Sequence, residues 1–476
     1  MGAILRTTGR VLLRSAPQLL AWFLAGWLGN HFALQLAGFV GGWWSTGGLL
    51  LLPLAVLARL VSFVAMFLVA RSALRELGFI ASVPESARER VATFVNSLLA
   101  GVLPFFAVYA AYGFLRDDFF EYVRLALQVH TGRIWAGEDV SGEDVSSAGF
   151  GVWTWVIIVV AYGLRWAWKR WDEKLPRSLS LVAVYLEAVW LFFFVWTLGD
   201  ITRTVGDWVA HRAAMVWIGE VHAWVAERIA VLGWVWDGVL WLIGQLGGVL
   251  LQPLAWLAVA GVIYGQAIAA ERITVSTRYA GNRYVRTVQR RYTVLPEWAR
   301  TRLGDIGEDL LDRFRPIGRS LLLMWRAGPV VIGSYVLLYT VVLAIQGFGP
   351  GWIVTLIGPQ DMATFWMRYQ TPIFLVVPMI VEPVRIAVVA AGYDATLGAL
   401  RRGAAVKAVE SAVAGGATPQ EAAAAAVLQA AQVVDEVVPD AVDAALAADA
   451  SVAPQGMTEK RGNGVESPTV NGTSTQ

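Results

Sequence analysis

Five charged side chains interrupt long apolar stretches of the sequence, and they are its strongest candidates for chemistry. They are Arg59, Glu187, Arg326, Glu382 and Arg385. A charge inside a membrane span is costly, so such residues pair with one another or line the path of an ion or solute. At 1.5 Å per helical residue, all five fall at like depth, roughly 7–17 Å from one end of their apolar runs. The sequence therefore predicts one charged layer, which is either a structural ion-pair network or a proton or anion path.

The eighth apolar run favours the second of these interpretations. It contains Glu382 and Arg385, three positions apart and hence on one face of a helix, together with Pro378 and Pro383. Each proline removes a backbone donor and clashes with a preceding carbonyl, so we expect a kinked or broken helix. Broken helices that carry ionisable residues near mid-depth form the sites of many transporters.

The elements that must position these charges are membrane-spanning helices. Of the 476 residues, 57% are hydrophobic and only 16% are charged, which is too much apolar surface for a soluble chain to bury. Apolar runs of about 20 residues predict an all-α polytopic membrane protein of about eight spans. The expected spans are 17–40, 47–70, 91–114, 150–168, 179–199, 247–270, 321–347 and 371–392.

The segments between the spans predict the orientation. Arg and Lys concentrate in alternate segments, so both termini are expected to be cytoplasmic in a multi-pass plasma-membrane protein. The segment 115–149 then becomes an external loop, and it carries Asp117, Asp118 and Glu121. A tandem acidic sequence within it, 138–146, lacks the spacing of a calcium loop and is interpreted as solvated.

One external segment has its own pattern. Between residues 201 and 246, apolar residues that include Trp217, Val221 and Trp224 recur at helical steps, which predicts an amphipathic helix on the outer surface. Its last third, 229–246, is apolar enough to enter the bilayer. If that part spans, there are nine transmembrane helices, but the charge alternation breaks after it, which favours eight.

The cytoplasmic material has three parts. Arg283, Arg286 and Arg290 share a helical face in the segment 271–320 and are either a basic patch for anionic lipid or part of an ordinary cytoplasmic loop. Residues 403–452 predict an Ala-rich helical tail, in which Thr418 and Glu421 have the spacing of a capping box. This tail is a candidate for binding a protein partner or a second copy. Residues 453–476 lack a buried-face pattern and are expected to be disordered.

A short internal similarity is also present. Residues 48–58 resemble residues 248–258, with Pro53 aligned to Pro253. This is either the trace of a parallel repeat of four spans plus four, as in some transporters, or a chance match between Leu- and Ala-rich segments.

Composition excludes several other functions. With no Cys, four His and a net charge of +2, we expect no disulfide, metal site or nucleic-acid partner. No catalytic or phosphate-binding motif occurs, so we expect neither an enzyme nor a cofactor. The leading hypothesis is an integral membrane protein that moves a small solute or ion through the charged layer. The alternative is a non-catalytic scaffold or regulator that binds lipids or protein partners.

Overall fold

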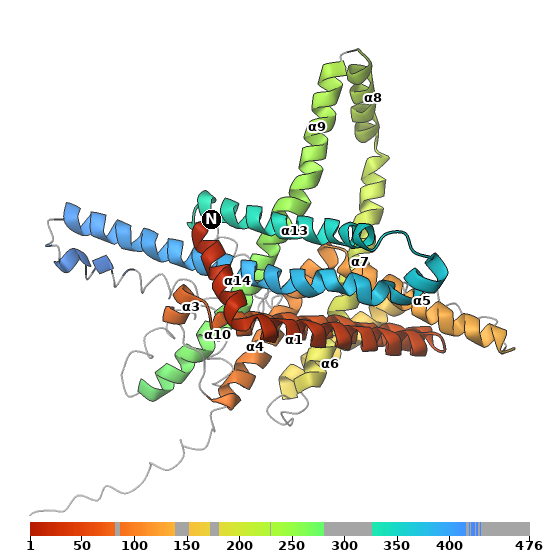
Figure 1. Ribbon diagram of the computed structural model, residues 1–476, viewed down its shortest axis with the longest axis horizontal. Coiled ribbons are helices and arrows are strands. Elements are labelled where there is room, and N and C mark those ends of the chain that lie inside the picture. Colours follow the sequence, from red (N-terminus) through yellow and green to blue (C-terminus); the bar gives the residue numbers. More distant parts are fainter. Residues whose placement is uncertain are drawn as a thin grey trace, which may run out of the picture.

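A computed structural model of the chain describes residues 1–80, 86–138, 152–171, 180–228, 230–279 and 326–415, with a few residues between 418 and 429. These residues form helices joined by short turns, and none of them is in a strand. The helices are α1 (Gly2–Gly41), α2 (Ser45–Arg71), α3 (Arg75–Ile80), α4 (Ala87–Ala111), α5 (Phe114–Trp135), α6 (Val152–Trp171), α7 (Ser180–Ala210), α8 (Ala213–Arg228), α9 (Ala230–Leu246), α10 (Gln252–Tyr279), α13 (Pro329–Ile357) and α14 (Met367–Ala414), with two π-helical turns, η3 (Gly247–Leu251) and η6 (Met362–Trp366) (Figure 1).

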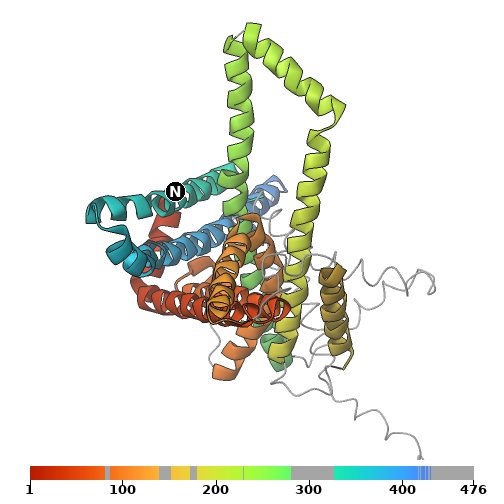
Figure 2. The ribbon, with the colours of Figure 1, turned by 90° about the vertical axis from the view of Figure 1, so that its right-hand side faces the viewer.

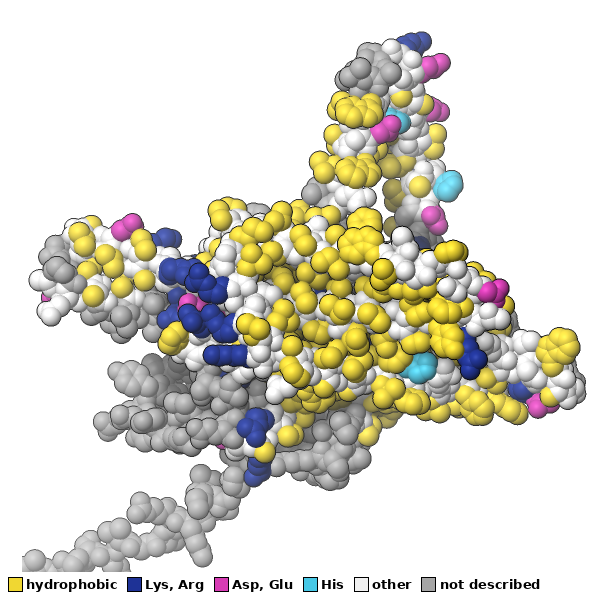
Figure 3. Space-filling model, viewed as in Figure 1, with side chains coloured by type: hydrophobic (Ala, Val, Ile, Leu, Met, Phe, Trp, Pro, Cys, Tyr) yellow, Lys and Arg dark blue, Asp and Glu magenta, His cyan; other side chains and the backbone are white. Residues whose placement is uncertain are grey.

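The fold confirms an all-α membrane protein. Within the described residues, seven helical stretches are long and apolar enough to cross a membrane: α1, α2, α4, α7, α9 through α10, α13 and α14. The predicted span 150–168 corresponds to α6, whose apolar part, Thr154–Ala167, is shorter than the other seven. Residues 230–246 do not add a separate span, because α9 continues through η3 into α10. Apolar side chains cover the face of the bundle formed by α1, α13 and α14 (Figure 3).

The α1–α2 hairpin packs closely because glycines remove side chains from its interface. A Cβ atom added to Gly26 would lie 2.2 Å from the Cβ atom of Ser62, and one added to Gly48 would lie 2.5 Å from the Cα atom of Gly41. Such small-residue contacts let two helix backbones approach where no hydrophobic force distinguishes protein from lipid. The second helix of this hairpin, α2, is largely buried and contacts α4, α5, α7, α10 and α14. It is therefore the central helix around which the charged residues gather.

The segment after α4 differs from the predicted external loop. Gly113 adopts a left-handed φ of 83° and ends α4, and the chain restarts as α5 one residue later. The apolar face of α5 packs on the second half of α1, where Gly38 contacts Leu125 and Gly41 contacts Tyr122. Residues 114–135 are helical, so their description as a loop was wrong. Charged residues between the apolar ones hide the helical repeat of the buried face of α5. Residues 139–151 lie outside the described part.

The segment 201–246 is an arm that extends from the bundle. The end of α7, all of α8 and most of α9 stand away from the other helices (Figures 1 and 2). The prediction of one amphipathic helix is therefore corrected to a pair, in which α8 packs on α9 through Gly233 and through His222 Nε2, 3.0 Å from Asp237 Oδ1. Six tryptophans are exposed on the arm: Trp208, Trp217, Trp224, Trp234, Trp236 and Trp241.

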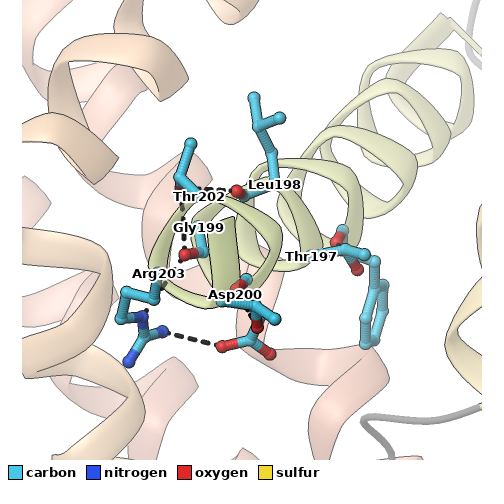
Figure 4. A network of polar contacts seen from close by, with 8 residues as sticks. Thr197, Leu198, Gly199, Asp200, Thr202 and Arg203 are labelled. Atoms are coloured by element: carbon cyan, nitrogen blue, oxygen red, sulfur yellow. Dashed lines mark hydrogen bonds and ion pairs between the residues drawn. The ribbon is translucent and has the colours of Figure 1, made fainter. Parts of the chain in front are cut away.

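At the base of the arm, α7 satisfies its own polar groups (Figure 4). Arg203 donates from Nη2 to Asp200 Oδ1 at 2.8 Å, and the Thr202 hydroxyl donates to the Leu198 carbonyl at 2.6 Å. Hydroxyl groups of helical Thr residues commonly bond to carbonyls three or four positions earlier. The helix can thus leave the bundle without polar partners from another element.

The C-terminal helix α14 is continuous through Pro372, Pro378 and Pro383, so the predicted break does not occur. Beyond the bundle it is secured to α3, since Asp394 Oδ1 accepts a hydrogen bond from Leu77 N at 3.0 Å and Arg401 Nη1 lies 2.7 Å from Glu76 Oε2. Lys and Arg side chains gather where α14 leaves the bundle (Figure 3).

The tail begins with the predicted capping box. Glu421 Oε2 accepts a hydrogen bond from Thr418 N at 2.8 Å, and Glu421 N donates to Thr418 Oγ1 at 3.4 Å. Reciprocal bonds of this kind satisfy donors that the first turn of a helix leaves free. Residues 430–476, which include the predicted disordered terminus, lie outside the described part.

Candidate functional site

The first half of the site is an ion pair between α2 and α5. Arg59 Nη2 lies 3.4 Å from Asp118 Oδ1 and donates to Asn30 Oδ1 at 3.2 Å. The other carboxylate oxygen of Asp118 accepts hydrogen bonds from Tyr109 Oη at 2.6 Å and from Asn30 Nδ2 at 3.3 Å. Four elements, α1, α2, α4 and α5, thus meet at one carboxylate, and each of the four side chains has a hydrogen-bond or ion-pair partner among the others.

The second half lies on α14. Glu382 and Arg385, with 6% and 1% of their surfaces exposed, form an ion pair through Oε2 and Nη2. The pair occupies one helix face, as the spacing predicts. The remaining guanidinium donors of Arg385, Nε and Nη1, have no hydrogen-bond acceptor among the described residues. This half is therefore rich in donors, unlike the first.

Aromatic rings join the two halves. The guanidinium carbon of Arg385 lies 4.7 Å from the centroid of the Trp256 ring and 5.8 Å from that of Phe63, which is one turn along α2 from Arg59. The guanidinium of Arg59 in turn lies 5.7 Å from the Tyr109 ring centroid. Cations over ring faces are stabilised by the ring quadrupole, more strongly where water is excluded. The rings thus help to hold two guanidinium groups close together inside an apolar bundle.

The charges of the two halves balance. Glu382 interacts electrostatically with Arg59 as well as with Arg385, so the two ion pairs form one layer. We call Arg59, Asp118, Glu382 and Arg385 the charged layer. With two guanidinium groups and two carboxylates, it is neutral when all four are ionised. A buried net charge would be far more costly than this compensated arrangement.

Two predicted members lie elsewhere. Glu187 on α7 is buried and accepts from Arg165 Nε on α6 at 3.0 Å, which is a separate ion pair. Arg326 is exposed and precedes α13, because that helix begins only at Pro329. Residues 321–325 of the predicted span lie outside the described part, so the place of Arg326 within a span stays a prediction. The predicted basic patch Arg283, Arg286 and Arg290 falls outside the described residues.

Sequence reasoning missed Asp118 and the uncharged residues around the charged layer, which are Asn30, Phe63, Tyr109 and Trp256. Asp118 was assigned to a loop, although Leu115, Asp118, Tyr122 and Leu125 recur at helical steps and all are buried. That period was the available signal. Asn30 and Trp256 gave no signal, because an amide or an indole in an apolar helix is ordinary until its tertiary neighbours are known.

The described residues hold no group of three His, Cys, Asp or Glu side chains that could bind a metal ion. A shallow pocket of about 330 Å³ lies between α1 and α14, lined by residues that include Trp27, Phe374 and Pro378. No residue of the charged layer lines it. The chemistry of the site therefore rests on its carboxylates, which can exchange protons, and on its guanidinium and indole groups, which can donate hydrogen bonds to an anion.

Comparison with known proteins adds no assignment to this geometry. No family model, no curated protein and no solved structure matches the chain.

Proposed function

We propose that this integral membrane protein moves a small solute or ion across the bilayer by way of the charged layer. The observation that carries this proposal is Arg385, a buried guanidinium beside a carboxylate, two of whose nitrogen donors have no acceptor among the residues that the structure describes. Transporters commonly place such ionisable groups near the middle of their spans.

A purely structural role accounts less well for this half of the layer. Buried donors are almost always paired, and each unpaired donor costs about 1–3 kcal/mol. Arg59 meets that expectation through Asn30 and Asp118. Arg385 does not, and its unpaired donors are explained if they bind a transported species during function.

The proline content of α14 supports the same proposal. Pro378 and Pro383 lie on either side of Glu382, and each lacks the N–H that a helix normally donates four residues back. The helix next to the ion pair therefore has fewer backbone bonds to break when it bends. Local bending at such positions is a common means of opening a path beside a buried site.

The proposal is tested by reconstituting the full chain in liposomes and measuring swelling by light scattering. We expect swelling in ammonium chloride, or in potassium chloride with valinomycin, to be faster than in protein-free liposomes. Arg385→Gln should abolish the increase, whereas Arg203→Gln, which removes an exposed guanidinium on α7, should not. Equal rates with and without the protein in both salts would refute transport of chloride. Parallel assays with nitrate and phosphate salts extend the test to other anions.

A second candidate function is a membrane scaffold, and the arm of α7, α8 and α9 favours it. The exposed tryptophans of the arm suit the bilayer interface or a second copy of the chain. If the arm joins copies, replacing Trp217 and Trp224 by Ser should convert oligomers in nanodiscs to monomers, as measured by mass photometry. An unchanged mass would refute this role for the arm.

We further propose a plasma-membrane location with both termini cytoplasmic, on the distribution of Arg and Lys. In this orientation the basic end of α14 and the segment with Arg283, Arg286 and Arg290 meet anionic lipid, and the tail after residue 402 is accessible to partners. A cysteine-labelling test of the orientation is described in the Discussion.

A further inference from the structure

Several buried nitrogen donors lie close together at Arg385 and Trp256. Among the described residues, Arg385 Nε and Nη1 and the indole Nε1 of Trp256 lack an acceptor, and Glu382 Oε2 meets Arg385 Nη2 as an ion pair without accepting a hydrogen bond. The two side chains are in contact, since the guanidinium carbon lies 4.7 Å from the Trp256 ring centroid. Both are buried, with 1% of their surfaces exposed. Buried donors without acceptors favour an anion, because an anion can accept from several of them at once.

The balance of charge sets a condition on that anion. The charged layer is neutral with two carboxylates and two guanidinium groups ionised. An anion added to it would leave one uncompensated negative charge in a buried site, which is strongly unfavourable. A proton added with the anion restores neutrality.

The proton acceptor best placed for this purpose is Glu382. Its carboxylate competes with an incoming anion for the same guanidinium, since its Oε2 is the ion-pair partner of Arg385. When Glu382 takes a proton from the aqueous side, its negative charge is lost and the guanidinium is released to bind the anion. When the proton leaves to the other side, the carboxylate re-forms the ion pair and displaces the anion. Each cycle moves one proton and one monovalent anion, and no charge is left behind.

On these grounds we propose that Arg385 and Trp256 bind a small monovalent anion, and that protonation of Glu382 couples its movement to a proton. The proposal rests on the transport function above and names its substrate class. Chloride and nitrate are the anions chosen for the test, because each carries the single negative charge that one proton on Glu382 balances.

The other charged and titratable groups facing Glu382 are few. From its own helix it meets Arg385, and from α2 it meets Arg59. From α13 it meets the phenol of Tyr339, and Tyr335 on the same helix acts on Arg385. Phenols stay neutral over the working range of pH, and guanidinium groups stay charged. The layer's other carboxylate, Asp118, is held by Tyr109, Asn30 and Arg59, whereas Glu382 is the carboxylate paired with Arg385. Glu382 is therefore the group beside Arg385 that can take up and release a proton.

Two salts separate coupled from uncoupled movement in the reconstituted full chain. In ammonium chloride, ammonia enters freely, so swelling requires chloride to enter with a proton. In potassium chloride with valinomycin, potassium carries charge, so swelling requires chloride to move alone. We expect the native protein to increase swelling at least tenfold in ammonium chloride and less than twofold in potassium chloride with valinomycin.

Variants of the pair test its assigned roles. Glu382→Gln should lose swelling in ammonium chloride and gain it in potassium chloride with valinomycin. The variant layer has one negative charge fewer, so it can accept an anion without a proton. Arg385→Gln should lose both, and Asp200→Asn, an exposed carboxylate of α7, should change neither. Glu382→Asp keeps a carboxylate and should retain coupling. It serves as the second variant if the Gln substitution does not fold, as judged by thermal melting.

The outcomes distinguish the two proposals. Native swelling that is equal in both salts would leave transport standing and overturn the coupling. Swelling that survives Arg385→Gln would overturn the anion site. Absence of swelling in every salt from folded, reconstituted protein would overturn the transport function itself.

Discussion

Arg59 on α2 and Asp118 on α5 form an ion pair, with 3.4 Å between Nη2 and Oδ1, in the interior of the helical bundle. The pair depends on the break at Gly113, which ends α4 and starts a second helix with its first turns beside α2. Without that break the chain could not bring Asp118 next to both Asn30 and Tyr109. A local backbone feature therefore places one of the two carboxylates of the charged layer.

Asp118→Asn should destabilise the protein. The change leaves the Arg59 guanidinium without its counter-charge, and removal of one partner of a buried pair costs about 3–5 kcal/mol. Because 30% of the Arg59 side chain is exposed, we expect the lower end, about 3 kcal/mol. Thermal melting in a mild detergent measures the loss. The double variant Arg59→Met with Asp118→Leu should recover part of it, since no buried charge then lacks a partner.

Glu121→Gln is the matched control on the same helix. Glu121 pairs with Arg124 at the surface of α5, and its hydrogen bond from that guanidinium lowers the pKa of the carboxyl below its usual value. Exposed pairs contribute only about 0–1 kcal/mol because water screens them. Its melting temperature should therefore stay close to that of the native chain. Equal losses for Asp118→Asn and Glu121→Gln would contradict the buried pair.

Gly113→Ala should weaken the break between α4 and α5. At a φ of 83° a Cβ atom is strained by about 1–2 kcal/mol even though no neighbouring atom lies in its way. Gly132→Ala, a helical position of α5 with the same open surroundings, should be neutral or stabilising by up to about 1 kcal/mol. Comparison of the two melting temperatures isolates backbone conformation from packing. A more stable Gly113→Ala variant would contradict the left-handed geometry.

Much of this architecture follows from the sequence because bilayer physics leaves few choices. Helices are the means by which these apolar runs can satisfy their backbone groups in lipid, so runs of about 20 residues locate them well. The pairing of Glu382 with Arg385 follows in the same way from their spacing and the cost of isolated charges. The positions of most apolar helices and one local ion pair are therefore accessible without coordinates.

The remainder depends on tertiary contacts or on weaker signals. The helix α13 begins later than the predicted span 321–347, because the apolar residues on both sides of Arg326 look like one continuous run. The signal for its start was Gly328 followed by Pro329. Asp118 was missed because its helix, α5, is polar on one side and carries too many charged residues to stand out as an apolar run. The contact between Arg385 and Trp256 joins α14 to α10, and no periodicity within either helix predicts it.

Cysteine labelling should establish the orientation. The native chain has no Cys, so single substitutions report without background. We expect Gly142→Cys to react with an impermeant maleimide added to intact cells and Asn282→Cys to react only after permeabilisation, since the Arg-rich segment is expected to be cytoplasmic. Labelling of Asn282→Cys but not of Gly142→Cys in intact cells would mean that the orientation is opposite to the predicted one. Equal labelling of both would require a different number of crossings between them.

The turn before α14 should show a pH dependence set by Asp361. Its carboxylate accepts hydrogen bonds from the Thr364 hydroxyl and from the Thr364 N–H, each at 2.7 Å, and these bonds lower the pKa of Asp361 below its usual value. A lowered pKa means that the folded state favours the ionised form. The resulting stabilisation is present above the usual carboxyl pKa and is lost as the pH falls through the lowered value.

Asp361→Ala should therefore lower the melting temperature slightly at about pH 7, and the deficit relative to the native chain should shrink as the pH falls through the lowered pKa of Asp361 and the native carboxyl takes up a proton. Asp361→Asn provides the control, because its amide oxygen still caps the helix but does not titrate. We expect the Asn variant to stay close to the native chain at neutral pH and to show a weaker pH dependence. If the melting temperature of Asp361→Ala stays below that of the native chain by the same amount at neutral and acidic pH, the contribution of Asp361 does not depend on its charge. Its hydrogen bonds from Thr364 would then not depend on ionisation.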